Sequence, residues 1–206
     1  MQLSLHGLYA LTDSHLIPEE KFIDTVEKAI VGGARIIQYR DKSNDKVLQV
    51  EQAQALRRLC QQYQIPFIIN DDIELALQVS ADGVHIGKED PDLVTARTIL
   101  GNHAIVGVSC YEQLSLAQQA VEAGATYVAF GRFFTSSTKP KAISCSVDVL
   151  RDARKMFNCP LVAIGGITPN NGAKLISAGA DCLAVIHGLF GQADVTTAAQ
   201  RYAQLF

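Results

Sequence analysis

In GGARIIQYRDK, residues 32–42, a glycine pair precedes an apolar run that ends in charged residues. Gly32 and Gly33 follow a segment of helical periodicity, Glu19–Val31, and glycine can take the left-handed backbone that ends a helix. The run Arg35–Arg40 is short and rich in β-branched residues, as strands buried between helices are. The stretch therefore predicts a helix, a tight turn and a buried strand with a polar far end.

The same order of elements recurs along the chain. Gly124-Ala125 and Gly179-Ala180 end further helical segments, and Pro66 and Pro160 stand just before apolar runs, where proline cannot continue the preceding helix. The further helical segments are Lys46–Tyr63, Leu114–Ala123 and Val147–Phe157. The expected strands are Leu8–Thr12, Arg35–Arg40, Phe67–Asn70, Gly83–Ile86, Ile105–Ser109, Tyr127–Gly131, Leu161–Ile164 and Cys182–Ile186.

Eight strand–helix units in 206 residues leave about 26 residues for each unit, near the lower size limit of a (β/α)8 barrel. Continuously apolar strands indicate burial on both faces, hence parallel strands covered by helices. An open doubly wound sheet would also alternate, but it would rarely use eight evenly spaced strands without a GxGxxG-type turn. We therefore expect an α/β protein of one domain, residues 1–206, folded as a TIM barrel with its active site at the carboxyl ends of the strands.

Composition excludes several classes of protein. Hydrophobic residues make up 48% of the chain and charged residues 19%, which excludes intrinsic disorder. We expect no membrane span and no export signal, since the apolar stretches are strand-sized and the N-terminus lacks a basic patch followed by an apolar run. Five scattered cysteines without a CxxC pair suit a reducing cytoplasm better than a disulfide framework or a zinc site. A net charge of −3 offers no general attraction to nucleic acid or membranes, so any anion site must be local.

Polar residues after the second strand are expected to reach the mouth of the barrel. Because side chains alternate along a strand, Gln38 and Arg40 share one face with Ile36, and Tyr39 takes the other. If the shared face looks inward, an amide and a cation reach the mouth, and Lys42 stands on the rim. The alternative for Arg40 or Lys42 is an ion pair at the rim with a nearby aspartate.

Carboxylates follow the third and fourth strands. Asp71 and Asp72 come directly after Asn70, and Asp90 follows the fourth strand. Neighbouring strand ends bring Asp71 and Asp90 within reach of one point, and two hard oxygen ligands with water and phosphate around them are the usual way to hold Mg²⁺. The alternative is that these aspartates cap the helices that follow. A pair of carboxylates on adjacent strand ends favours the metal.

Hydroxyl, cationic and glycine residues follow the later strands. Ser109 is a candidate phosphate donor, but no acid or histidine at triad-like spacing supports a nucleophilic role. The sixth loop, residues 132–141, is long and rich in hydroxyls and cations, as binding loops are, although a merely solvated loop is an alternative. Gly166 follows the seventh strand and Ile186-His187 stands at the end of the eighth, where barrels of this class usually bind phosphate through backbone N–H groups. The His187 side chain either touches that phosphate or fills the rim.

Two residues of reactive types are interpreted as parts of the core. His85 lies inside the fourth strand and is expected to be a buried, hydrogen-bonded histidine. Cys110 is expected to be a small core residue rather than a reactive thiol.

The candidate residues form two anion sites. The first is cationic and metal-assisted, and comprises Arg40, Lys42, Asn70, Ser109, Lys139 and a metal held by Asp71 and Asp90. The second is a backbone cradle, with hydroxyl residues between the two sites: Gly166, Ile186, His187, Ser136, Ser137 and Thr138. Three cationic side chains and Mg²⁺, less two carboxylates, leave a charge of about +3, which is close to that of a diphosphate. A diphosphate at one site and a phosphate at the other imply transfer of a group between two substrates.

Six stretches in order are more specific than any one motif: LYALTD (8–13), IQYRDK (37–42), INDDIELAL (69–77), ADGVHIGKED (81–90), TKP (138–140) and AIGGIT (163–168). Together they resemble the thiamine-phosphate synthase family along nearly the whole chain. The resemblance implies an enzyme that joins 4-amino-2-methyl-5-(diphosphooxymethyl)pyrimidine to a thiazole phosphate with Mg²⁺, giving thiamine phosphate and diphosphate. It also implies small-molecule partners, no nucleic acid and no membrane, and it leaves the oligomeric state open.

The resemblance assigns residues by position. The positions expected to bind the pyrimidine diphosphate are Gln38, Tyr39, Arg40, Asp41, Lys42, Asn70, Ser109 and Lys139. The metal ligands correspond to Asp71 and Asp90, and the thiazole phosphate is expected at Ser136, Ser137, Thr138, Gly166, Ile186 and His187. The catalytic candidates are Lys139, Arg40 and Ser109. Two positions depart from the family pattern, because many relatives have a small hydroxyl residue at 187 and proline at 132.

Two other functions fit parts of this pattern. A thiazole tautomerase, which is an isomerase of the same fold, would need the cradle but not the joint presence of Lys42, Asn70, Asp71, Asp90 and Lys139. A non-catalytic sensor of phosphorylated metabolites would bind without turnover. The synthase alone explains both sites, and its chemistry explains why no nucleophile is evident. An electron-rich aminopyrimidine stabilises a cation once diphosphate leaves, so the protein needs only to stabilise the leaving charge and align the acceptor.

Overall fold

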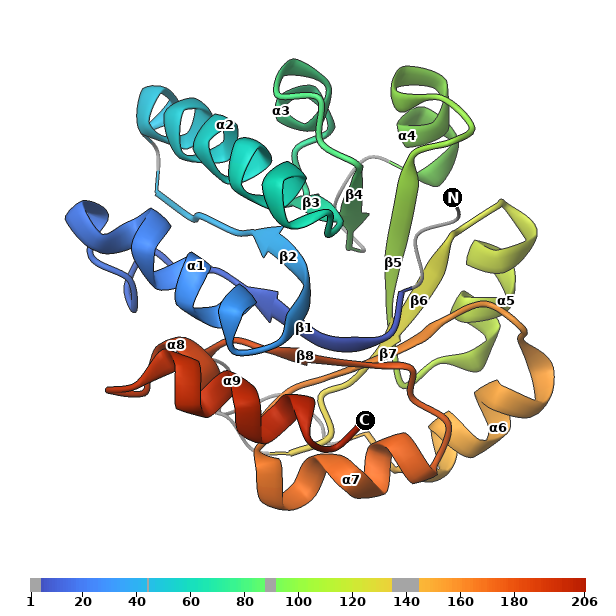
Figure 1. The fold of residues 1–206 in the computed structure, drawn as a ribbon. Helices are drawn as coiled ribbons and strands as arrows, with labels where there is room; N and C mark the ends of the chain where they lie inside the picture. Colours follow the sequence, from blue (N-terminus) through green and yellow to red (C-terminus); the bar gives the residue numbers. More distant parts are fainter. Residues whose placement is uncertain (1–4, 44, 88–91, 135–144) are drawn as a thin grey trace.

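The structure, a computed structural model, describes residues 5–43, 45–87, 92–134 and 145–206. Its strands are β1 (Gly7–Leu11), β2 (Ala34–Tyr39), β3 (Phe67–Asn70), β4 (Gly83–Ile86), β5 (Ile105–Tyr111), β6 (Tyr127–Phe130), β7 (Leu161–Ile164) and β8 (Cys182–Val185). Each strand pairs in parallel with the next, and β8 pairs with β1, so the sheet closes into a barrel in sequence order (Figure 1). The predicted (β/α)8 barrel is confirmed.

Helices surround the barrel and join successive strands (Figure 1). They are η1 (Glu19–Lys21), α1 (Phe22–Val31), α2 (Lys46–Tyr63), α3 (Ile73–Gln78), α4 (Leu93–Leu100), α5 (Leu114–Glu122), α6 (Asp148–Met156), α7 (Pro169–Ser177), α8 (His187–Phe190) and α9 (Val195–Ala203). Within the described ranges, no helix has the length and apolar character needed to cross a membrane.

The turns that lead into the strands have the predicted geometry. Gly33, Gly124 and Gly179 follow helices and have φ angles of 113°, 93° and 115°, which L side chains rarely adopt. Strands β3 and β7 begin immediately after Pro66 and Pro160. The main difference lies in β5, which continues to Tyr111 beyond the predicted end at Ser109, with a register shift against β6 at that point.

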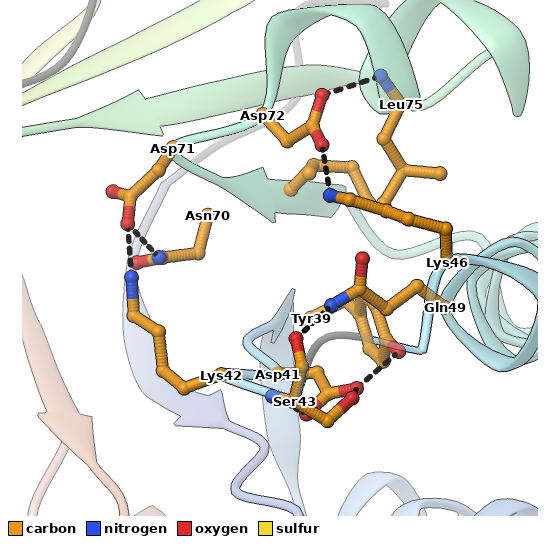
Figure 2. Close-up of a pocket in the computed structure, with 11 residues that line it drawn as sticks. Tyr39, Asp41, Lys42, Ser43, Lys46, Gln49, Asn70, Asp71, Asp72 and Leu75 are labelled. Atoms are coloured by element: carbon orange, nitrogen blue, oxygen red, sulfur yellow. Dashed lines mark hydrogen bonds and ion pairs between the residues drawn. The ribbon is translucent and has the colours of Figure 1, made fainter.

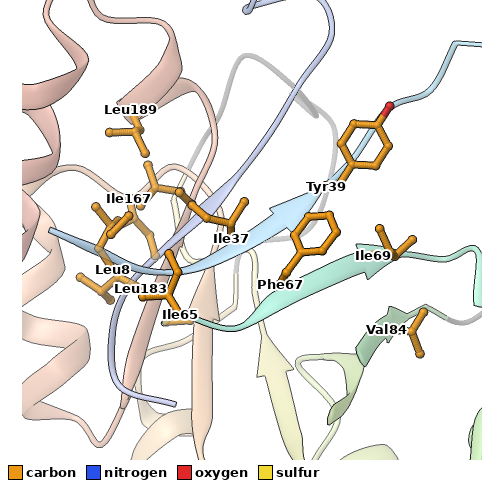
Figure 3. Close-up of a cluster of buried hydrophobic side chains, with 14 of the residues drawn as sticks. Leu8, Ile37, Tyr39, Ile65, Phe67, Ile69, Val84, Ile167, Leu183 and Leu189 are labelled. Atoms are coloured by element: carbon orange, nitrogen blue, oxygen red, sulfur yellow. The ribbon is translucent and has the colours of Figure 1, made fainter. Parts of the chain in front are cut away.

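The core has two layers because side chains alternate across each strand. One layer packs between strands and helices and includes Leu8, Ile37 and Phe67 (Figure 3). The other fills the barrel itself and includes Tyr9 and Ile36, which alternate with those residues along β1 and β2. Adjacent residues along a strand therefore point to opposite sides of the barrel wall. This alternation determines which side chains at the strand ends point into the barrel.

Candidate active site

The end of β2 divides its polar residues between two faces, as the alternation predicts. Gln38 lies inside the barrel, where it is 2% exposed and bonded to Tyr9. Tyr39 lies on the outside, in the layer beneath the helices, with its ring edge-on to Phe22. Asp41 belongs to the same outer side, where its carboxylate accepts hydrogen bonds from the N–H and hydroxyl of Ser43. Tyr39 therefore lies on the opposite face of β2 from Gln38, and the contact of Tyr39 and Asp41 with the pyrimidine diphosphate stays a prediction.

Arg40 is held at the mouth by the end of β1. Its Nη1 lies 3.0 Å from Asp13 Oδ2, and both side chains are mostly buried. Its backbone N–H donates to Thr12 Oγ1 at 2.8 Å, and the Thr12 hydroxyl donates to the Arg40 carbonyl at 3.1 Å. The rim ion pair considered from the sequence is therefore present, and it fixes the guanidinium beside the mouth.

Lys42, Asn70 and Asp71 converge at the ends of β2 and β3. Lys42 Nζ lies 2.6 Å and Asn70 Nδ2 2.5 Å from the same oxygen, Asp71 Oδ2 (Figure 2). The Asp71 backbone has a φ of 65°, and its N–H donates to the carbonyl of His85 on β4. A cation, an amide and a carboxylate thus meet where two strands end.

The capping alternative holds for Asp72, one of the aspartates for which it was considered. Asp72 caps α3 by accepting from the Leu75 N–H at 2.8 Å, and Lys46 Nζ lies 3.4 Å from its other oxygen (Figure 2). Asp72, and not Asp71, is the N-cap residue of α3, and the Asp71 carboxylate is bonded to Lys42 and Asn70 instead. Asp90, the second predicted metal ligand, lies outside the described residues. Among the residues that are described, no three His, Cys, Asp or Glu side chains cluster in a way that could hold a metal.

A cavity of about 370 Å³ opens beside these groups, between the loops that follow β2 and β3 (Figure 2). It is lined by Tyr39, Asp41, Lys42, Ser43, Lys46, Gln49, Ile69, Asn70, Asp71, Asp72 and Leu75. Burial opposes ionisation of Asp41, but the hydrogen bonds from Ser43, Ser14 and Tyr39 together outweigh it and lower the pKa of this carboxyl. The hydrogen bonds of Asp41 within its own loop therefore hold one part of the cavity lining, to which Lys42 and Asp71 also belong.

Five polar side chains cross the interior of the barrel and are called the interior relay: Gln38, Tyr9, Tyr127, His85 and Ser109. Gln38 Nε2 donates to Tyr9 OH at 2.8 Å, and Tyr9 OH lies 2.8 Å from Tyr127 OH. The Tyr127 hydroxyl lies 2.9 Å from His85 Nδ1, and His85 Nε2 lies 2.8 Å from Ser109 Oγ. Burial lowers the pKa of His85 to about 4, against a smaller opposing effect of the Asp71 charge.

His85 was expected to be buried and hydrogen-bonded, and its side chain is bonded at both ring nitrogens. His85 is partly exposed, however, and its side chain bonds Ser109. It therefore lies next to the candidate site rather than deep in the core. Sequence reasoning missed Tyr9 and Tyr127 altogether. Alternation along β1 and β6 would have placed both on the inner face, but only residues at strand ends were considered.

The candidate phosphate cradle lies at the ends of β7 and β8. Gly165 and Gly166 have φ angles of 103° and 66°, which favour glycine, and the Gly166 carbonyl accepts from Asn171 Nδ2 at 3.1 Å. Ile186 and His187 stand at the start of the short helix α8. These strands are neighbours, so both segments reach the same side of the mouth. Ser136, Ser137, Thr138 and Lys139 lie outside the described residues.

Comparisons with known proteins agree on one family. The family model for thiamine monophosphate synthase matches residues 8–189. A thiamine-phosphate synthase of Nitrosococcus oceani is 51% identical over 206 residues, which cover 100% of this chain and 95% of that protein. One from Marinobacter nauticus is 50% identical over 202 residues, covering 97% and 90%. The solved thiamine phosphate pyrophosphorylase from Pyrococcus furiosus aligns with a TM-score of 0.87 and 34% identity over 97% of this chain and 94% of that one.

Proposed function

Because the chain belongs to the thiamine monophosphate synthase family, a family of transferases in thiamine biosynthesis, we propose that it joins 4-amino-2-methyl-5-(diphosphooxymethyl)pyrimidine to a thiazole phosphate. The products are thiamine phosphate and diphosphate. The observation that carries this proposal is the meeting of Lys42, Asn70 and Asp71 beside Arg40 at the ends of adjacent strands. A thiazole tautomerase would release no diphosphate and would not need that group of residues.

The diphosphate is proposed to bind where the cations gather. Lys42 is half-exposed and pairs with Asp71, so its ammonium can turn from the carboxylate to a phosphate oxygen without losing a buried contact. Arg40 stays fixed by Asp13 and Thr12, and it offers its remaining N–H donors to the same anion. Asn70 and Ser109 add uncharged donors, and Lys139, in the undescribed part of the sixth loop, is proposed to add a further cation. Gln38 is proposed to bind the pyrimidine from the floor of the mouth.

Magnesium fits the donor type of this site. Asp71 offers hard carboxylate oxygens at the end of β3, and it lies beside Lys42 and Asn70, which are suited to an anion. We propose that Asp71 holds Mg²⁺ together with Asp90. When bound there, the ion neutralises part of the negative charge of the diphosphate.

The thiazole phosphate is proposed to bind at the opposite side of the mouth. Gly166 and the Ile186-His187 segment supply backbone at neighbouring strand ends, and the hydroxyl residues Ser136, Ser137 and Thr138 are proposed to complete the site. His187 stands where many relatives have a small hydroxyl residue, which a contact through the backbone N–H tolerates.

The proposed reaction needs no protein nucleophile or general base. The bond between the pyrimidine methylene carbon and the diphosphate oxygen breaks, and its electron pair leaves with the diphosphate. The aminopyrimidine ring stabilises the resulting cation, and the thiazole nitrogen then donates its lone pair to the methylene carbon. Arg40, Ser109 and Lys139 are proposed to stabilise the leaving charge, and losing one such donor typically raises the barrier by about 2.7–4 kcal/mol.

The test is to incubate the purified protein with both substrates and Mg²⁺ and to measure diphosphate and thiamine phosphate together. We expect equal amounts of the two products, none when either substrate is left out, and strong inhibition by EDTA. Conversion of the thiazole phosphate alone, without diphosphate, would show an isomerase. Binding of either substrate with no turnover would show a sensor and reject the proposal.

A further inference from the structure

The Gln38 amide presents Nε2 to Tyr9 OH, and from this placement we infer the direction of the interior relay. Burial raises the pKa of both Tyr9 and Tyr127, so each phenol keeps a proton to donate. Tyr9 accepts from Gln38 Nε2, and the acceptor left for its own proton among the described residues is Tyr127 OH. The proton of Tyr127 then goes to His85 Nδ1, the remaining partner of that hydroxyl.

This direction sets the tautomer of His85. A neutral imidazole whose Nδ1 accepts a hydrogen bond carries its proton on Nε2. That proton is donated to Ser109 Oγ, 2.8 Å away. Because His85 Nε2 is the donor in this bond, it cannot accept a hydrogen bond from Ser109. We infer that the Ser109 hydroxyl donates its proton toward the mouth instead. Turning the Gln38 amide over would reverse every bond in the relay and move the His85 proton to Nδ1.

The packing of the barrel reserves space for the tyrosine at the centre of the relay. A Cβ added at Gly107 on β5 would lie 1.9 Å from Tyr127 Cζ and 2.3 Å from its hydroxyl oxygen. The Gly107 backbone does not have the left-handed geometry that itself favours glycine. Glycine at position 107 therefore leaves room for the Tyr127 ring. Tyr127 is 1% exposed and does not reach the mouth.

We propose that Tyr127 is a positioning residue that acts through His85 to make the Ser109 hydroxyl a hydrogen-bond donor toward the mouth. This role rests on the proposed function, in which the departing diphosphate collects negative charge beside Ser109. A serine that donated to His85 instead would present its oxygen lone pairs to that charge. Because Tyr127 is 1% exposed, its proposed effect passes through His85 and not through contact with a substrate.

The first experiment measures the tautomer in the full chain without substrates. Nitrogen-15 NMR of histidine-labelled protein at pH 7.5 is expected to show the His85 proton on Nε2, with the signal assigned by its loss in His85→Gln. In Tyr127→Phe, Nδ1 loses its donor, and we expect a mixture of the two tautomers. Tyr63→Phe is the matched control, because that hydroxyl bonds Glu27 at 2.8 Å outside the barrel. A proton on Nδ1 in the unsubstituted protein would overturn the proposal.

The second experiment is a double-mutant cycle on turnover. The loss of one oriented hydrogen bond, about 1–1.5 kcal/mol, predicts a fall in kcat of about 5- to 13-fold for Tyr127→Phe. In a Ser109→Ala background the same substitution should change kcat less than about twofold, because its effect passes through the missing hydroxyl. An equal loss in both backgrounds would show a merely structural role and reject the proposal.

The two experiments separate this inference from the proposed function. If the unsubstituted protein releases no diphosphate, the proposed function fails, while the tautomer still decides the direction of the relay. If diphosphate is released but the proton lies on Nδ1, only the positioning role fails. Should Tyr127→Phe not fold, the tautomer of the unsubstituted protein still tests the proposal, and a proton on His85 Nδ1 would reject it.

Discussion

Lys42 Nζ lies 2.6 Å from Asp71 Oδ2, and this ion pair joins the ends of two neighbouring strands. The lysine side chain is 54% exposed and the aspartate 30%, so the pair is screened by solvent and contributes little to stability. Substitutions at either residue should therefore change activity much more than the free energy of unfolding.

Asp71→Asn is expected to weaken the response to Mg²⁺. The amide removes the negative charge but keeps the shape, so the Mg²⁺ concentration for half-maximal activity should rise by about 10-fold or more. Asp72→Asn is the matched control one residue away, because asparagine also caps helices well. A Mg²⁺ titration of both variants checks this, and equal shifts would show that Asp71 is not a ligand.

Lys42→Met is expected to weaken use of the pyrimidine diphosphate. Methionine keeps the length of the chain without the charge, and the loss of one cation beside the leaving group should lower kcat/KM for that substrate about 10- to 100-fold. Lys46→Met removes the neighbouring lysine, which pairs with Asp72 instead, and should change kcat/KM less than about twofold. The KM for the thiazole phosphate should stay the same in both variants. If Lys42→Met changed only this KM, Lys42 would have to be assigned to the thiazole phosphate site instead.

Gly107→Ala is expected to destabilise the barrel, because its methyl group would occupy the position of the Tyr127 ring. Overpacking of this kind costs about 1–3 kcal/mol or more. Gly101→Ala is the comparison, since no atom lies within 4 Å of its Cβ and only its φ of 85° opposes a side chain. Urea unfolding should show the larger loss for Gly107→Ala, and a smaller loss would mean that the ring can move aside.

The buried thiols are expected to be unreactive at pH 8. Burial raises the pKa of Cys60 and Cys110 to about 12, which leaves about one thiolate in ten thousand at that pH. Since the thiolate is the reactive form, labelling of these two cysteines should accelerate only as the pH rises well above 9 or as the protein unfolds. Thiol labelling followed by peptide mapping checks this, with the partly exposed Cys159 as internal comparison. Rapid labelling of Cys110 in the folded protein would contradict its place in the core.

Local sequence patterns predicted the barrel because each strand and each turn is determined mainly by residues close together in the sequence. The apolar runs, the glycine turns and the alternation along β2 depend on neighbours in sequence, and they placed Gln38 inside and Tyr39 outside correctly. The partner of Arg40 could not be predicted in the same way. Asp13 lies 27 residues earlier, and only the pairing of β1 with β2 brings the two together.

The interior relay was beyond prediction for a similar reason. Periodicity tells which face of a strand Tyr9 and Tyr127 occupy, but not that they meet across the barrel, because this depends on the register of all the strands between them. The distinction between Asp71 and Asp72 turned on the backbone conformation of a single residue. Neighbouring aspartates have equal capping propensities, so the sequence pattern left that choice open.

The left-handed backbone at Asp71 is uncommon for any residue other than glycine and costs stability. Glycine would relieve that cost, so a population of variants screened only for heat resistance should drift toward glycine at position 71. Variants with glycine at position 71 would be more stable to heat but would lack the carboxylate that is proposed to hold Mg²⁺. Anyone engineering a tougher version of this enzyme should hold that position constant and seek gains on the outer helices.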